Sequence, residues 1–219
     1  CIRDRSINSI SGPTFKSRQI PPIKNFISAP ADLSIVCVSK SLMQQSRFLD
    51  SRFAYTGYLR WQSDTDDALE EELIQFCKGD AVPIITFGSV SFDHIKDIMS
   101  RFEKNWPKGQ KIILQSGWAG LSIQINRPEI KIIDQVSHDQ LFKHAACVIH
   151  HGGAGTTASV LHAGVPHVVV PHLGDQDFWA KEIIRLGAGI RLSKKHWPER
   201  LYKAVQKIRN GLHFCLLYT

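Results

Sequence analysis

The stretch HHGGAGTTASVLHAGVP, which runs from His150 to Pro166, decides how the rest of the chain is interpreted. It follows a short apolar segment that ends at His150, and three of the four residues from position 152 to 155 are glycine. A helical pattern begins near Thr156. A strand that passes through a glycine-rich turn into a helix is the repeating connection of α/β domains. We therefore expect a strand that ends at His150, a glycine-rich turn and the start of a helix in this stretch.

Apolar segments alternate with amphipathic segments over the remainder of the chain. We expect strands over residues 33–39, 82–89, 111–117, 130–135, 146–150, 166–171 and 188–192. We expect helices over residues 64–79, 93–105, 138–145, 156–163, 175–187 and 198–211. Strands that are apolar throughout, each followed by a helix, indicate a parallel sheet covered on both faces. The predicted fold class is a doubly wound, Rossmann-like α/β domain that occupies residues 31–214.

The segments outside this domain have a different character. Residues 6–30 include SGPTFKSRQIPPIKNF, which has three prolines and little periodicity, so we interpret them as the tail of a preceding domain and a linker. Residues 1–5 and 215–219 fit neither neighbourhood. One DNA sequence, TGTCTCTTATACACA, encodes the last five residues, and its opposite strand encodes Cys1–Asp4. It resembles a transposon end used in sequencing, so we hypothesise that both ends are translated adapter scars.

Composition narrows the classes of partner and compartment. The chain has 219 residues and a net charge of +7, with its basic residues spread out except for Arg191, Lys194 and Lys195. No aromatic-interleaved basic motif accompanies them, so we expect no nucleic-acid partner, and peripheral membrane contact stays an open alternative. The five cysteines form no CxxC pair, which predicts no metal site and fits a cytoplasmic location. No apolar run approaches the ~18 residues of a membrane span.

The glycine stretch has the features of a phosphate site. Helix starts carry free amides and about half a positive charge, and glycines let a ligand approach the backbone. A tight turn whose glycines serve only close packing is the alternative. The stretch lacks the Lys-Ser/Thr ending of a P-loop, the GxGxxG pattern and an acid after the next strand. Hydrolysis of nucleoside triphosphates and binding of NAD are therefore both disfavoured.

A second polar pair follows the next predicted strand. Asp175 and Gln176 stand at a helix start, on the same edge of the predicted sheet as the glycine stretch. A carboxylate beside an amide supplies both acceptors and a donor, which suits sugar hydroxyls. The alternative is that Asp175 only caps its helix.

These residues carry a resemblance to a known family. The stretch from Val136 to Ile190 resembles the C-terminal donor-binding domain of UDP-glycosyltransferases with two facing Rossmann-like domains, the GT-B fold. Within that family it most resembles sterol 3-β-glucosyltransferases and the related macrolide and flavonoid enzymes. AYTGYL, ITFGSV and LQSGWAGL, which begin at Ala54, Ile85 and Leu114, agree in order. The sequence departs from the family pattern at Ser137, which is usually proline, and at Leu59, which is usually aromatic.

The resemblance implies a role for each matching residue. It implies a donor diphosphate site formed by His151, Gly153, Ala154, Gly155, Thr156, Gly88 and Ser89. It implies that Asp175 and Gln176 bind the transferred sugar. It implies a nucleobase edge formed by Val136, Ser137, His138 and Trp118, with burial of Trp118 in the core as an alternative. The resemblance implies a UDP-sugar as the donor substrate, with glucose as the expected hexose, and no metal or other cofactor.

The resemblance also implies what this chain lacks. The family's histidine base belongs to the N-terminal acceptor domain, and residues 6–27 contain no matching segment. We therefore expect this chain to be the C-terminal half of an inverting enzyme and to be inactive alone. The sterol or other hydrophobic acceptor is expected to bind the absent N-terminal domain. Further histidines are expected to be structural or solvated, namely His94, His144, His162, His167 and His172. Two alternatives stay open: a nucleotide-sugar-binding homologue without transfer activity, and an epimerase or lipid-intermediate transferase of the same fold.

Overall fold

The chain forms two compact units in its computed structural model. The structure describes residues 33–42, 53–59, 66–88, 94–116, 125–134 and 136–211. One unit comprises residues 1–40 and 44–57, and the other comprises residues 41–43 and 58–219. The predicted sites at Ser89 and Trp118 lie outside the described residues.

The smaller unit contains a two-stranded parallel sheet. Its strands are β1 (Ser34–Val36) and β2 (Phe53–Tyr55), with Ile35 opposite Ala54. The expectation of a buried strand over residues 33–39 is wrong, because Ile35 is 62% exposed. The strand is shorter than expected and pairs with β2 instead of joining the large sheet. A sheet of two three-residue strands has too few neighbours to cover both of its faces.

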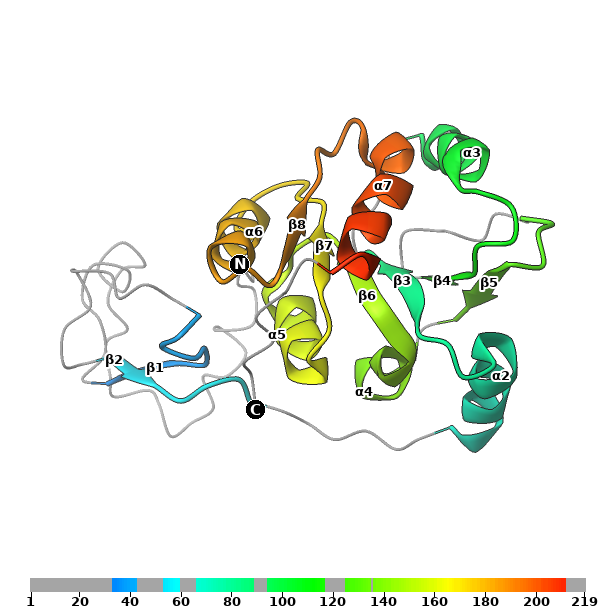
Figure 1. Ribbon diagram of the computed structural model, residues 1–219. Helices are drawn as coiled ribbons and strands as arrows, with labels where there is room; N and C mark the ends of the chain where they lie inside the picture. The colour runs from blue at the N-terminus through cyan, green and yellow to red at the C-terminus, as the bar shows by residue number, and fades with distance from the viewer. Residues whose placement is uncertain are drawn as a thin grey trace, which may run out of the picture. The chain divides into compact units, whose positions relative to one another are not determined.

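The larger unit is built on a six-stranded sheet in the order β5-β4-β3-β6-β7-β8, and every pair is parallel (Figure 1). The strands are β3 (Val82–Thr86), β4 (Ile112–Gln115), β5 (Ile130–Ile133), β6 (Ala145–His150), β7 (His167–Val169) and β8 (Gly189–Arg191). Their apolar character follows from their position, since a parallel sheet is covered on both faces.

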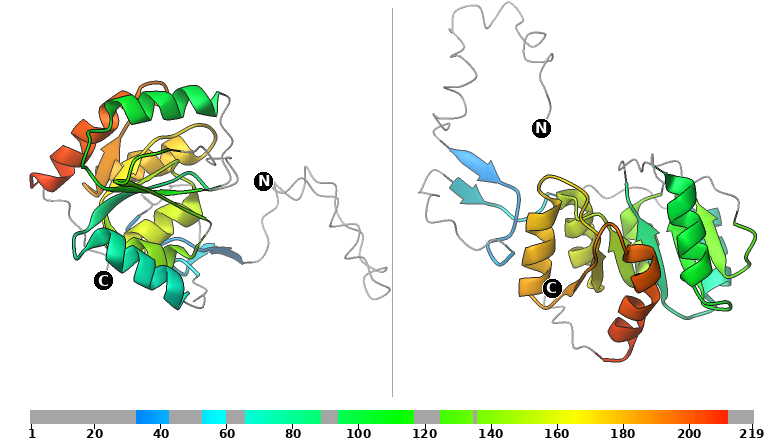
Figure 2. Two further views of the ribbon diagram at one scale, coloured as in Figure 1. Left: turned by 90° about the vertical axis from the view of Figure 1, so that its right-hand side faces the viewer. Right: turned by 90° about the horizontal axis from the view of Figure 1, so that it is seen from above.

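Helices lie on both faces of this sheet, which gives three layers (Figure 2). The helices are α2 (Asp67–Cys77), α3 (Ile95–Asn105), α4 (His138–Leu141), α5 (Ala154–Ala163), α6 (Gln176–Arg185) and α7 (Trp197–Arg209), and a 3₁₀ turn η3 (Phe142–His144) follows α4. The predicted doubly wound α/β fold is confirmed. Among the described helices, none combines the length and the apolar character needed to cross a bilayer.

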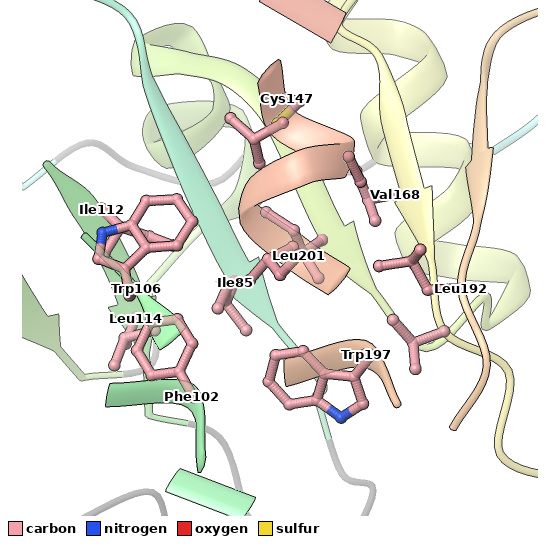
Figure 3. Close-up of a cluster of buried hydrophobic side chains, with 14 of the residues drawn as sticks. Ile85, Phe102, Trp106, Ile112, Leu114, Cys147, Val168, Leu192, Trp197 and Leu201 are labelled. Carbon is pink, nitrogen blue, oxygen red and sulfur yellow. The ribbon is translucent and has the colours of Figure 1, made fainter. Parts of the chain in front are cut away.

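Two separate hydrophobic cores hold the layers together. On one face, α3 and α7 bury Phe102, Trp106 and Trp197 against β3 and β4 (Figure 3). The rings of Phe102 and Trp106 stack with their centroids 5.8 Å apart. On the opposite face, α2, α4 and α5 cover the sheet with a second cluster that includes Leu73 and Val160. Large apolar side chains that are removed from water in this way supply most of the favourable free energy of folding.

Candidate functional site at the carboxyl edge of the sheet

The strand order places a topological switch point between β3 and β6. From β3 the chain proceeds outward to β4 and β5, and from β6 it proceeds outward in the other direction to β7 and β8. In open α/β sheets, ligands bind outside the carboxyl ends of the strands at such a point. Gly88 follows β3 and His151 follows β6. These two residues are neighbours, because a Cβ atom added to Gly88 would lie 3.5 Å from Cε1 of His151.

The glycines of the turn after β6 are required for two different reasons. Gly152 has φ +91°, and a Cβ there would lie 2.8 Å from Cγ1 of Val169 and 3.0 Å from the carbonyl oxygen of Gln176. Gly153 has an ordinary negative φ, but a Cβ there would collide with Nε2 of His151. Gly152 therefore allows the turn to pack closely, and Gly153 makes room for the histidine ring.

Helix α5 begins at Ala154, two residues earlier than its sequence predicts. Its N-cap is Gly153, and among the described residues no side chain caps it. Thr157 is fully buried, and its amide donates to the carbonyl of Gly153 at 2.9 Å. The first amides of a helix have no acceptor within it and lie at its positive end. The start of α5 is thus an uncapped cluster of donors, with open space above Gly155.

His151 completes this cluster from the side. It is half-buried, and its Nδ1 is buried without a hydrogen-bond partner in the part of the chain that the structure describes. Burial lowers the pKa of His151, while the carboxylate of Asp175 opposes that shift and His138 adds to it. A neutral imidazole carries one donor and one acceptor. His151 can therefore offer an N–H group beside the helix start at neutral pH.

Asp175 and Gln176 lie at the start of α6, after β7, and differ in their freedom to bind a ligand. Asp175 is exposed and is the N-cap residue of α6, but its side chain makes no capping hydrogen bond, so the structure does not support the alternative that it serves only as a cap. Its Oδ2 accepts a hydrogen bond from Nε1 of Trp179 at 2.9 Å. Gln176 is buried, and its Oε1 accepts from the amides of His172 at 2.8 Å and Leu173 at 3.2 Å. The Gln176 acceptor is thus occupied, and its N–H₂ group remains as a donor.

Residues 136–138 border the site on the β4 side. Val136 accepts a hydrogen bond through its carbonyl from Nε2 of Gln115 at 2.9 Å, and Gln115 is the buried last residue of β4. The ring of His138 stacks on Phe142 with 4.6 Å between centroids. Burial lowers the pKa of His138. Sequence reasoning missed Gln115, although a single polar residue at the end of the apolar strand IILQ was a signal for it.

The histidines that were expected to be structural or solvated have varied surroundings. His144 lies 2.9 Å from a carboxylate oxygen of Glu70. Burial lowers the pKa of His172 to about 4, and its ring packs edge-on against Phe87 with 5.6 Å between centroids. Burial lowers the pKa of the fully buried His167 to about 3. The absence of a catalytic residue from this chain stays a prediction.

The fold matches that of known proteins. A six-stranded parallel sheet with helices on both faces and a switch point between β3 and β6 is the fold of a GT-B glycosyltransferase domain. Residues 111–214 match the family described as the C-terminal domain of erythromycin biosynthesis protein CIII-like proteins. This part of the chain is therefore similar to a C-terminal domain of the UDP-glycosyltransferases.

Individual relatives agree with this assignment. The chain is 38% identical over 123 residues to the sterol 3-beta-glucosyltransferase UGT80B1 of Arabidopsis thaliana, covering 54% of this chain and 20% of that protein. It is 32% identical over 133 residues to the vancomycin aglycone glucosyltransferase of Amycolatopsis orientalis, and this match covers 59% of this chain and 32% of that protein. The structure of the kitacinnamycin glycosyltransferase superposes with a TM-score of 0.65 at 21% identity, covering 82% of this chain and 47% of that one. The chain thus spans a fifth to a third of these curated relatives.

Proposed function

We propose that this chain is the donor-binding half of a UDP-sugar-dependent glycosyltransferase. In this proposal a hexose, with glucose as the first candidate, is transferred to a hydroxyl group of a sterol or another hydrophobic acceptor with inversion. The observation that carries the proposal is the uncapped start of α5 with the ring of His151 beside it at the switch point. That arrangement concentrates donors and positive potential where a diphosphate would bind.

The diphosphate is held by the backbone in this proposal. The amides of Ala154, Gly155 and Thr156 precede the first helical hydrogen bonds of α5, and the open space above Gly155 admits phosphate oxygens. His151 donates from the side, and Gly88 lies beside its ring. Ser89 is proposed for the same site. When the sugar leaves, negative charge grows on UDP, and donors that are already oriented stabilise that charge without reorganising. The charge is therefore met by protein donors, and the proposal invokes no metal or other cofactor.

The transferred sugar is held by the start of α6. The free oxygen of Asp175 accepts hydrogen bonds from sugar hydroxyls, and Trp179 keeps the carboxylate in place. The N–H₂ group of Gln176 donates to a further hydroxyl, because its Oε1 is already used by the loop. Val136, Ser137 and His138 border the nucleobase, and Trp118 is proposed for the same edge.

The acceptor and the catalytic base belong to the other half of the enzyme in this proposal. A base there removes the proton of the acceptor hydroxyl, which then displaces UDP. The names of the relatives, a sterol 3-beta-glucosyltransferase and a vancomycin aglycone glucosyltransferase, both support glucose, and the first supports a sterol acceptor. A sterol acceptor would bring a cytoplasmic enzyme into peripheral contact with a membrane.

Calorimetric titration of the 219-residue chain with UDP, ADP and NAD tests the donor class. We expect UDP to bind most tightly, since the sequence lacks the acid that would take a ribose of NAD. Equal affinity for all three ligands would contradict the proposal.

A further inference from the structure

Two histidines behind the glycine turn form a buried pair that the proposed chemistry does not use. His150 is the last residue of β6 and His167 is the first residue of β7, and both side chains are fully buried. Nε2 of His150 lies 3.0 Å from Nδ1 of His167. The other nitrogen of His150, Nδ1, lies 3.1 Å from the backbone nitrogen of Gly152. The pair therefore links the start of β7 to the glycine turn that follows β6.

The hydrogen bonds fix which nitrogen of each ring carries the proton. The amide of Gly152 can only donate, so Nδ1 of His150 must be the acceptor. A neutral imidazole has one N–H group, so Nε2 of His150 carries the proton and donates it to Nδ1 of His167. Burial, together with the neighbouring imidazole of His167, holds the pKa of His150 well below its ordinary value, which favours this neutral form. His167 then carries its own proton on Nε2.

The bond to Gly152 acts on the residue where the turn is most constrained. Gly152 has φ +91°, and its backbone is packed against Val169 and the carbonyl of Gln176. The next residue, Gly153, is the N-cap of α5, and the residue before Gly152 is His151. A shift of the Gly152 amide would therefore move the ring of His151 and the first amides of α5 together.

We propose that His150, supported by His167, is a positioning residue for the donor diphosphate. Its Nδ1 holds the amide of Gly152, and this bond orients the turn so that His151 and the α5 amides face one ligand. His150 itself is buried and does not touch the ligand. The inference rests on the proposed function, because the ligand being positioned is the diphosphate of a nucleotide. This positioning role is additional to the contribution to stability that we expect from His150 as the buried last residue of β6.

Two substitutions of His150 separate the two hydrogen bonds. His150→Asn retains an acceptor at the place of Nδ1, because its carboxamide branches at the same carbon, and it loses the reach to His167. His150→Gln reaches His167 with an N–H₂ group and has no acceptor near Gly152. We expect the full chain with His150→Asn to bind UDP within about twofold of wild type, and His150→Gln to bind about tenfold more weakly. Both variants lose one buried hydrogen bond, so a loss of stability alone predicts equal effects. Equal weakening, or greater weakening by His150→Asn, overturns the proposal.

A measurement without ligand separates this proposal from the proposed function. Nitrogen-15 NMR of the imidazole rings should show His150 neutral, with its proton on Nε2. A proton on Nδ1 overturns the positioning role even where UDP binds normally. Failure of the wild-type chain to bind UDP, with the expected proton on Nε2, overturns the proposed function and the ligand-positioning role with it, while the bond to Gly152 stands.

Discussion

The indole N–H of Trp179 donates a hydrogen bond to Oδ2 of Asp175 across one turn of α6, at 2.9 Å. Trp179 is buried, whereas Asp175 is exposed at the edge of the sheet. The exposed carboxylate is thus held by a side chain that is anchored in the core. Such support reduces the freedom that a binding group must give up when the ligand arrives.

Replacing Trp179 with phenylalanine should separate sugar binding from nucleotide binding. The substitution removes the N–H group and keeps an aromatic ring in the core. We expect UDP-glucose to bind roughly threefold to tenfold more weakly, since a single hydrogen bond contributes about 1 kcal/mol, and UDP to bind as in wild type. Titration with both ligands measures this, and an equal loss for both would contradict a sugar-binding role of Asp175.

Alanine at the two glycines that flank Ala154 should have different effects. Gly153→Ala should lower both the melting temperature and the affinity for UDP, because its Cβ displaces the ring of His151. Gly155→Ala places its Cβ in open space within a helix, where alanine is favoured over glycine by up to about 1 kcal/mol. Its melting temperature should be unchanged or higher, whereas its affinity for UDP should fall.

Thermal unfolding and calorimetry on the same two variants measure both quantities. Unchanged UDP affinity in Gly155→Ala would mean that no phosphate occupies the space above the start of α5.

His151→Ala should weaken UDP binding about tenfold to a hundredfold, because a donor to a charged group contributes roughly 1.5–3 kcal/mol. His144→Ala is the matched control, since His144 pairs with Glu70 away from the glycine turn. Its affinity for UDP should stay at the wild-type value. Similar losses in both variants would show that the effect on binding comes from a general loss of structure.

The buried histidine pair should make the fold sensitive to acid. Burial lowers the pKa of His167 to about 3, against an ordinary value near 6.5 in the unfolded chain. Below pH 6.5 the unfolded chain binds a proton that the folded chain excludes, so the free energy of unfolding falls as the pH is lowered. The expected loss for this residue is roughly 1 kcal/mol per pH unit down to about pH 3.

Urea denaturation at several pH values between 7 and 4 measures this dependence. The ionisable neighbours that act on His150 are His167, His151 and His138, and Asp175 acts on His151. His167→Gln cannot take up a proton, so its stability should depend less steeply on pH than that of wild type. An unchanged slope would mean that His167 is not held neutral in the fold.

The chain by itself should bind UDP-glucose and transfer nothing. The acceptor site and the base belong, in our proposal, to the other half, and alignment of acceptor with donor supplies a large share of the rate. An assay with a sterol acceptor and radiolabelled UDP-glucose measures transfer. Product above the no-protein control would show that a catalytic base lies within these residues.

The sequence predicts the parts of this structure that depend on local pattern. Each apolar segment of the large sheet and each amphipathic helix follows from periodicity, and the position of His151 at a helix start follows from the glycine turn. The sequence pattern predicts the start of α5 two residues late, because Gly153 serves as the N-cap and has no side chain that would mark it. The pairing of Ile35 with Ala54 could not be read, since an apolar segment does not specify its partner strand.

The missing details of the site are also contacts between distant residues. Gln115 holds Val136 over 21 positions, and His150 meets His167 over 17. Such contacts depend on strand register, which is set only when the sheet is assembled. The hydrogen bonds that distinguish Asp175 from Gln176 have the same origin in packing.

The strand order has a consequence for the way in which this chain folds. β6, α5 and β7 are consecutive in the chain, so they can associate after closing short loops. β3 and β6 are neighbours in the sheet, but β4 and β5 lie between them in the sequence, so their pairing closes a longer loop. Closing the longer loop costs more chain entropy, and such non-local pairing slows folding. Gly88 arrives beside His151 only with that pairing. We therefore expect the two walls of the site to meet late in folding, after the hydrogen-bonded turn at Gly152 has formed.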